Sequence, residues 1–206
     1  MLETFLKKNG EIFLENAHFS RLKNSAKFFK FNFPEKKIRE NFRDFCEKFS
    51  EKKSWKIRLK LQKNGEYFFS GDEIFLEKFF LKKKIVKISA KKLDSKNFFL
   101  AHKNSKIREF YDAEMKKKSP KIFGLIFKNE KNEICEANSS NIFAEIRGEI
   151  LTPPQKCGLL PGTFRADFLA KKKCREKILH EKDLFSAEKI FFGNSVRGIF
   201  RVFLEK

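Results

Sequence analysis

The stretch Gly158-Leu159-Leu160-Pro161-Gly162-Thr163-Phe164-Arg165 is the most informative local pattern in the chain. Its glycines and proline form a loop, and helix-compatible sequence follows from Thr163 to about Lys172. A loop that opens a helix presents unpaired backbone N–H groups at the positive end of the helix dipole, and Thr163 adds a hydroxyl. These groups suit a phosphate. An ordinary Pro-Gly turn would contain the same residues, so the loop alone leaves both interpretations open.

Two further segments carry groups of chemical interest. Gly193-Asn194-Ser195 follows the apolar residues 190–192 and offers a hydroxyl and backbone N–H groups in a small loop. Lys103 follows the apolar run 98–101 and precedes polar residues, so it lies where a strand ends and a helix begins. Spacing alone does not distinguish Lys103 from a surface lysine.

The flanking sequence predicts an α+β fold in two lobes. Asn-Gly pairs at 9–10 and 64–65 indicate two hairpins, and apolar residues at helical spacing predict helices over 17–29, with Asn16 as the N-cap, and over 34–49. A strand is expected at 85–89. We place the domain boundary in the polar stretch 93–97, which gives a small N-terminal α/β lobe, 1–96, and a strand-rich C-terminal lobe, 97–206.

The second lobe should alternate strands and short helices. Helices are expected over 106–118, 163–172 and 182–187, and strands over 122–128, 133–135, 141–146, 149–152, 189–193 and 199–204.

The composition is strongly basic but not organised for nucleic acid. The 206 residues carry a net charge of +20, yet the lysines are spread along the chain in runs no longer than three. The 28 Phe residues fill core positions in a compositionally biased protein. The four Cys residues lack metal-site or disulfide-framework spacing, so no metal is expected. No apolar stretch is long enough to span a membrane and no signal peptide is visible, which predicts a soluble, cytoplasmic protein.

Ordered segments along almost the whole chain resemble the fold-type IV pyridoxal-phosphate enzymes, and within them the aminodeoxychorismate lyase branch. The segments are Leu2-Glu3-Thr4-Phe5, Ile12-Phe13-Leu14, His18-Phe19-Ser20-Arg21-Leu22, Ser25-Ala26, Ile57-Arg58-Leu59, His102-Lys103, Phe110-Tyr111-Asp112, Glu136 through Asn141-Ile142-Phe143, Leu151-Thr152-Pro153-Pro154, the 158–165 loop, and Gly193-Asn194-Ser195-Val196-Arg197-Gly198. Any one segment could be chance, but the set in this order is specific. The resemblance implies a two-lobed fold-type IV architecture with pyridoxal 5'-phosphate as cofactor.

The resemblance also implies roles for single residues. Lys103 would carry the cofactor as a Schiff base, and Glu136 would pair with the pyridinium nitrogen and keep it protonated, so that the ring acts as an electron sink. Arg21, the N–H groups of Thr163 and Phe164, and the hydroxyls of Thr163 and Ser195 would hold the phosphate, while Leu160 packs on the ring. Tentative substrate contacts are Thr4, Arg58, Asn194 and Arg197; a cross-strand ion pair is nearly as reasonable a role for Arg58.

One spacing departs from the family pattern. Tyr111 lies eight residues after Lys103, whereas typical family members have a spacing of seven. Either the helix start carries an extra residue or Lys106 is the cofactor lysine, and His102 before Lys103 favours the first explanation.

The branch predicts the reaction. The segments at 2–4, 102–103 and 193–198 look most like the lyases that convert 4-amino-4-deoxychorismate to 4-aminobenzoate and pyruvate for folate synthesis. The alternative is a branched-chain or D-amino-acid aminotransferase, which would share the cofactor residues. A basic nucleic-acid-binding module is a rival of another class. Relatives generally form homodimers, and the start at Met1 resembles the lyase domain that some bacteria fuse behind a chorismate-aminating synthase, so a synthase partner is plausible.

Overall fold

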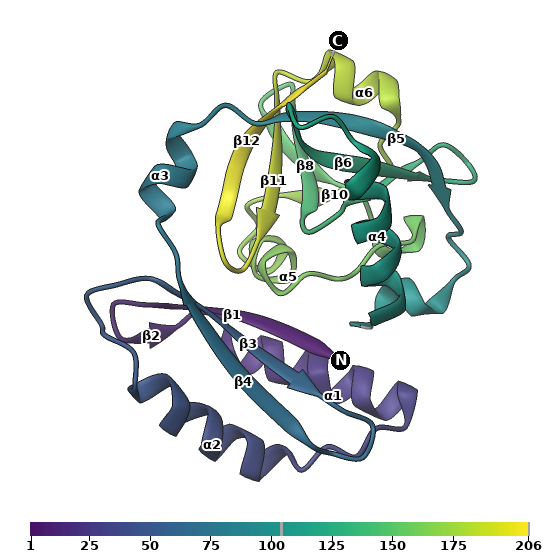
Figure 1. Ribbon diagram of the computed structural model, residues 1–206. Helices are drawn as coiled ribbons and strands as arrows, with labels where there is room; N and C mark the ends of the chain where they lie inside the picture. The colour runs from purple at the N-terminus through teal and green to yellow at the C-terminus, as the bar shows by residue number, and fades with distance from the viewer. Residues whose placement is uncertain (104, 206) are drawn as a thin grey trace.

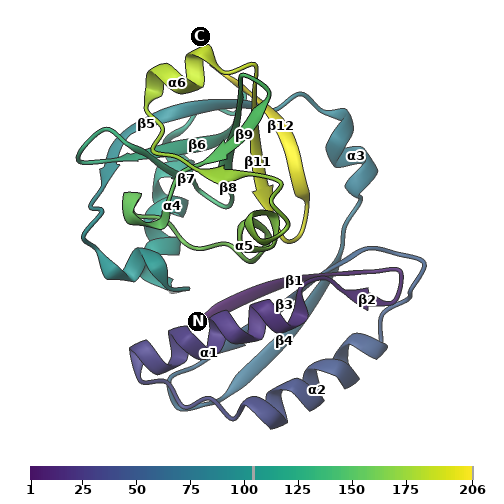
Figure 2. The ribbon, with the colours of Figure 1, turned by 180° about the vertical axis from the view of Figure 1, so that it is seen from behind.

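The computed structural model describes residues 1–103 and 105–205 as two lobes, each built on its own sheet (Figures 1 and 2). The small lobe has an antiparallel sheet in the order β2-β1-β3-β4 and two helices. Its elements are β1 (Leu2–Lys8), β2 (Glu11–Ile12), α1 (Glu15–Phe29), α2 (Glu35–Glu47), β3 (Trp55–Leu61) and β4 (Tyr67–Glu73). Both predicted hairpins and both predicted helices are present. The predicted N-cap is wrong, because Asn16 lies inside α1 and the cap position is Leu14 in a left-handed conformation.

Alternation along the small sheet separates its two faces. In β3, Ile57 and Leu59 are fully buried and join Phe19 and Phe42 in one core against α1 and α2. Side chains of a strand alternate between faces, so Arg58 faces the other way, toward the large lobe. Burial of the apolar face against the helices therefore fixes which charged side chains of β3 reach the space between the lobes.

The large lobe has an eight-stranded sheet in the order β10-β9-β8-β11-β12-β5-β6-β7. Its strands are β5 (Ile85–Leu93), β6 (Ile122–Asn129), β7 (Ile134–Ala137), β8 (Asn141–Ile146), β9 (Glu149–Thr152), β10 (Arg175–Glu176), β11 (Lys189–Asn194) and β12 (Gly198–Leu204). Its helices are α4 (Ser105–Lys117), α5 (Thr163–Ala170), α6 (Glu181–Ser186) and the short 3-10 turns Phe98–Ala101 and Gln155–Cys157, and α3 (Leu76–Leu81) joins it to the small lobe. The sheet is curled, and α5 lies on the side facing the small lobe (Figure 2).

The chain changes sheets earlier than the predicted boundary. β5 pairs in parallel with β12 and β6 in the large sheet, so the change falls between β4 and β5 and not at 93–97. A division into folding units at residue 96 stays a prediction. The α+β class and the two-lobed architecture predicted from the sequence are confirmed. Within the described residues, no helix is both long and apolar enough to cross a membrane.

Candidate active site

A cavity of about 410 Å³ lies between the two lobes. All of the site residues predicted from the sequence line it: Arg21, Lys103, Glu136, Leu160, Thr163, Phe164 and Ser195 for the cofactor, and Thr4, Arg58, Asn194 and Arg197 for the substrate. These residues come from both sheets, from α1 and α5 and from connecting loops, so only the folded chain brings them together.

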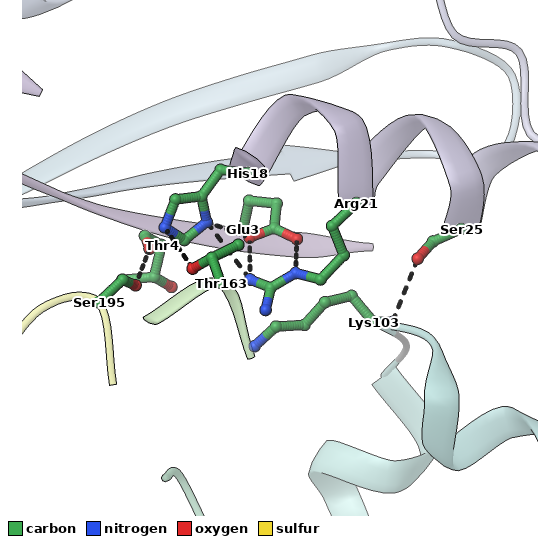
Figure 3. Close-up of polar contacts among 8 residues, drawn as sticks. All are labelled: Glu3, Thr4, His18, Arg21, Ser25, Lys103, Thr163 and Ser195. Carbon is green, nitrogen blue, oxygen red and sulfur yellow. Dashed lines mark hydrogen bonds and ion pairs between the residues drawn. The ribbon is translucent and has the colours of Figure 1, made fainter. Parts of the chain in front are cut away.

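Lys103 lies at the large-lobe wall of the cavity, just before α4, and its half-buried side chain extends toward the Arg21 guanidinium (Figure 3). Its backbone N–H donates to the Ser25 hydroxyl on α1 over 3.3 Å. Burial and, to a smaller extent, the nearby Arg21 charge lower the pKa of its amine to about 8, against the opposing effects of Glu3 and Glu136. Lys106 is exposed and lies outside the cavity wall, so of the two candidate lysines only Lys103 reaches this space.

Glu136 is a buried carboxylate at the end of β7. One oxygen accepts a hydrogen bond from the Tyr111 hydroxyl at 2.6 Å, and the other accepts one from the Leu160 N–H at 3.2 Å. Burial raises the pKa of Glu136 to about 7, although both hydrogen bonds and the Lys103 charge favour the ionised form. No ion pair holds this carboxylate within the described residues, so a cationic ligand beside it would be stabilised.

Arg21 is held in place by a fully buried carboxylate on β1. Its Nε and Nη2 atoms donate to the two oxygens of Glu3 at 2.9 and 2.6 Å, an arrangement that fixes the plane of the guanidinium. The Arg21 guanidinium and the hydrogen bond from His18 hold the pKa of Glu3 well below its usual range, despite the burial that opposes ionisation. Glu3 thus positions Arg21 at the edge of the cavity (Figure 3).

The loop before α5 brings backbone N–H groups to the cavity. Thr163 is the first residue of α5, so its N–H and that of Phe164 belong to the first turn, whose N–H groups have no partner within the helix. Asn141 donates to the Leu160 carbonyl at 2.9 Å, and a Cβ at Gly162 would lie 2.1 Å from the Asn141 oxygen. Only glycine therefore fits where the loop crosses Asn141.

The loop after β11 is shaped by its own asparagine. The Asn194 side-chain oxygen accepts hydrogen bonds from the N–H groups of Val196 and Arg197 at 3.1 and 2.9 Å, and its nitrogen donates to the Ser140 hydroxyl at 2.9 Å. Ser195 donates to the Thr4 carbonyl over 3.5 Å, across the lobes (Figure 3). Asn194 therefore orders the loop that carries Ser195 and Arg197.

The remaining predicted residues, Thr4, Arg58 and Arg197, line the part of the cavity that we call the cationic wall. Thr4 is paired with Arg58 across β1 and β3. Arg58 makes an ion pair with Asp72 of β4, and this is the cross-strand ion pair that the sequence offered as the alternative role for Arg58. The Arg197 guanidinium lies 4.5 Å from the centre of the Phe79 ring, and burial lowers the pKa of Arg197. In the described part of the chain, Arg197 forms no ion pair with a carboxylate.

Sequence reasoning missed five residues around the cavity as site residues: Glu3, His18, Lys56, Arg108 and Tyr111. Three of them stood inside the quoted family segments without a role. Lys56 could have been found from the alternation of β3, which places it on the same face as Arg58. For Arg108, on the surface of α4, no sequence signal was available.

These groups fit a phosphorylated aromatic aldehyde with a ring nitrogen. The cavity offers a lysine amine of lowered pKa, a buried carboxylate that lacks an ion-pair partner, and a guanidinium beside the N-terminus of a helix. An amine, an acceptor for a ring N–H, and a phosphate cup are the three groups that pyridoxal phosphate needs.

The whole chain matches one family model. Residues 1–203 match the model for amino-transferase class IV. The chain belongs to this family. The fold-type IV architecture predicted from the sequence is confirmed. The cofactor of class IV aminotransferases is pyridoxal phosphate, so the predicted cofactor is confirmed as well, and the protein is an enzyme of this family acting on a small molecule. No curated protein matches the sequence.

Several solved structures are similar over the full length of this chain. A protein from Mesorhizobium loti named as an amino-acid aminotransferase is 30% identical, with a TM-score of 0.88 over 100% of this chain and 99% of that one. The pyridoxal-phosphate-bound form of a hypothetical aminotransferase from Mycobacterium tuberculosis is 17% identical, with a TM-score of 0.84 over 100% and 81%. The 4-amino-4-deoxychorismate lyase from Pseudomonas aeruginosa is 16% identical, with a TM-score of 0.79 over 100% and 83%. The last two show the shared fold alone.

Proposed function

We propose that this class IV enzyme is an aminodeoxychorismate lyase, which eliminates pyruvate from 4-amino-4-deoxychorismate to leave 4-aminobenzoate for folate synthesis. The observation that carries the proposal is the distribution of charge in the cavity. Beyond Arg21 and Lys103, its wall contains Lys56, Arg58, Arg108 and Arg197, and Glu136 is the one acidic residue among its described lining residues. Such a wall suits a substrate with two carboxylates.

In this proposal the cofactor phosphate would be held by Arg21, the N–H groups of Thr163 and Phe164, and Ser195. Arg21 supplies a guanidinium already oriented by Glu3, and the first turn of α5 supplies N–H groups at its positive end. Glu136 would accept a hydrogen bond from the ring N–H and so keep the ring nitrogen protonated, and Leu160 would pack on the ring.

Lys103 is the proposed catalytic residue. When bound, the cofactor supplies an electron sink next to the carbon that carries the substrate amine. The Lys103 amine, whose pKa is about 8, is neutral often enough near neutral pH to take the proton from C4 of the substrate ring. The same amine, once protonated, delivers a proton to the departing enolpyruvyl group. Aromatisation of the ring then drives the reaction, and the proposal requires no metal.

The substrate's carboxylates are assigned to the cationic wall. Arg197 has a guanidinium without a carboxylate partner in the described residues, so it is the stronger ligand, and Arg58 shares its charge with Asp72. Thr4 lies beside Arg58 on the same face, and Asn194 holds the Arg197 loop.

An aminotransferase is the second candidate, because the Mesorhizobium loti protein that is 30% identical over the full chain bears that name. Its cofactor contacts would be the same, and the difference lies in which substrate the cationic wall accepts. The segments at 2–4, 102–103 and 193–198 favour the lyase.

The experiment is a direct comparison of the two reactions. The purified protein with pyridoxal phosphate is given 4-amino-4-deoxychorismate, or a branched-chain or D-amino acid with a keto acid as acceptor. We expect stoichiometric 4-aminobenzoate and pyruvate from the first and no amino transfer in the second. The lyase proposal would be contradicted if the protein formed a keto acid from an amino acid and formed no 4-aminobenzoate.

The setting of the enzyme follows from the same proposal. We propose a cytoplasmic homodimer that receives its substrate from an aminodeoxychorismate synthase, with neither a membrane nor a specific nucleic acid as partner. Sedimentation of the purified protein tests the dimer, and co-purification with the synthase tests the partner.

A further inference from the structure

His18 connects the two elements that supply the phosphate cup. It lies three residues before Arg21 on α1, and its ring is fully buried in the small lobe. One ring nitrogen, Nδ1, lies 2.8 Å from a Glu3 oxygen, and the other, Nε2, lies 3.2 Å from the Thr163 hydroxyl at the start of α5 in the large lobe (Figure 3). The Phe5 ring packs on it with a centroid distance of 4.6 Å, which restricts its rotation.

The partners of His18 determine where its proton lies. A carboxylate only accepts hydrogen bonds, so the 2.8 Å contact with Glu3 requires a hydrogen on Nδ1. The Arg21 Nη2 atom lies farther from Nδ1, at 3.3 Å, and donates to the same Glu3 oxygen at 2.6 Å. Burial is the main effect that lowers the pKa of His18, and the positive charges of Arg21 and Lys103 lower it too, while Glu3 opposes them. In the neutral ring with its hydrogen on Nδ1, Nε2 can only accept a hydrogen bond. Thr163 must therefore donate its hydroxyl hydrogen to His18.

This hydrogen-bond direction has a consequence at the phosphate. A threonine hydroxyl has a single hydrogen, and phosphate oxygens are acceptors. Because that hydrogen is donated to His18, Thr163 can bind the phosphate through its backbone N–H only. Its hydroxyl, bound to His18, instead fixes the position of the N-terminus of α5 relative to Arg21.

We propose that His18 is a positioning residue for the cofactor phosphate: anchored by Glu3, it binds the Thr163 hydroxyl and so fixes the first turn of α5 against the Arg21 guanidinium. One buried series of hydrogen bonds, from Glu3 through His18 to Thr163, therefore connects the two lobes. It positions both phosphate ligands, the Arg21 guanidinium and the first turn of α5. The inference rests on the cofactor and its phosphate cup, and it holds whichever reaction the enzyme performs.

The test uses the full-length apo-protein with Lys103 intact and measures the affinities for pyridoxal phosphate and for pyridoxal. The His18→Asn variant keeps a donor near the Nδ1 position for Glu3 but is too short to reach Thr163. We expect it to bind pyridoxal phosphate roughly tenfold more weakly, a loss of about 1.4 kcal/mol, with pyridoxal affinity changed less than about twofold. His18→Gln, whose amide can reach the place of Nε2, should recover most of the loss.

A double-mutant cycle identifies the partner of the Thr163 hydroxyl. Thr163→Val removes the hydroxyl at nearly constant volume, and Thr163→Ser retains it. If the hydroxyl acts through His18, the losses from Thr163→Val and His18→Asn are not additive, and Thr163→Ser binds like the wild type. Additive losses would show that the hydroxyl binds the phosphate itself and would overturn the proposal, as would a His18→Asn variant with unchanged or tighter affinity for pyridoxal phosphate.

The readout separates positioning from general damage. A variant that merely destabilises the fold lowers the affinities for pyridoxal and pyridoxal phosphate together, and that result also contradicts the proposal. Thr163→Val leaves Glu3 and His18 in place, so it still tests the proposal if His18→Asn folds poorly: it should weaken the binding of pyridoxal phosphate more than that of pyridoxal, and an unchanged affinity for pyridoxal phosphate would contradict the proposal. Failure of lyase activity in the wild type would leave all of these affinities measurable.

Discussion

The two ends of the cavity differ in how their side chains are held. At the cofactor end, Glu3 and Thr163 are buried and bound to other residues, and Glu136 accepts two hydrogen bonds. At the substrate end, Arg58 is one-third exposed and paired with an exposed Asp72. Buried networks have one geometry because any other leaves a polar group unsatisfied, whereas half-exposed cations can be resolvated. In the proposed assignment, the cofactor end therefore sets the chemistry common to the family, and the substrate end is free to set specificity.

Replacing Lys103 should give the largest effect, because it removes the nucleophile and the acid–base group together. We expect Lys103→Ala to lose the visible absorbance of the bound cofactor and at least about 10⁴-fold of turnover. Lys106→Ala is the matched control, and it should keep both because Lys106 is exposed outside the cavity. Borohydride trapping followed by peptide mapping checks the assignment. Cofactor trapped on Lys106 would show that the lysine was misassigned.

Glu136→Gln should be next in size, because it removes the anion beside the ring nitrogen while keeping groups that can bind Tyr111 and Leu160. Turnover should fall roughly 10²- to 10³-fold, with a smaller change in cofactor affinity. A kcat that changes less than about threefold would mean that Glu136 does not face the ring nitrogen.

The same substitution should have the opposite effect on the stability of the apo-protein. The pKa of Glu136 is raised from 4.5 to about 7, so the folded state binds more protons between these values and its free energy of unfolding falls as pH rises through this window. At pH 8, we expect apo Glu136→Gln to be more stable than the wild type by on the order of 3 kcal/mol, because the variant avoids the cost of ionising a buried carboxylate. This difference in the free energy of unfolding should vanish below about pH 4.5. Urea unfolding at several pH values measures this. A pH-independent difference would contradict it.

Arg197→Met should weaken substrate binding more than Arg58→Met does. Losing a charge-assisted hydrogen bond costs about 1.5 to 3 kcal/mol, so the KM should rise roughly 10- to 100-fold for Arg197→Met. Arg58 is already neutralised by Asp72, and its loss should raise KM only a few-fold. Steady-state kinetics with a constant cofactor concentration gives both values. Equal effects would mean that the two arginines share one carboxylate.

The pH dependence of cofactor capture should be the smallest effect. The neutral Lys103 amine is the nucleophile, and its pKa of about 8 means that its neutral fraction rises about fivefold from pH 7 to pH 8 and then levels off. Stopped-flow absorbance of pyridoxal phosphate mixed with apo-protein follows this rate. A rate that keeps rising steadily to pH 10 would indicate a lysine of ordinary pKa.

Several predictions from the sequence hold in the structure because they depend on local order. The Asn-Gly hairpins and the helix that opens at Thr163 are such local features. The ordered family segments predicted the fold class, the cofactor and the residues that line the cavity. The sheet of β5 could not be predicted, because a parallel strand finds its partners through tertiary packing and no local turn defines them.

The sequence by itself determined which residues are candidates, since the segments around Lys103, Glu136 and the loop into α5 resemble those of the family. Only the tertiary structure decided how these groups are held. Glu3 and His18 looked like ordinary strand and helix residues until folding buried them against Arg21 and Thr163, 145 positions beyond His18 in the chain. A buried polar group must find its partner in space, and that partner has no fixed distance along the sequence.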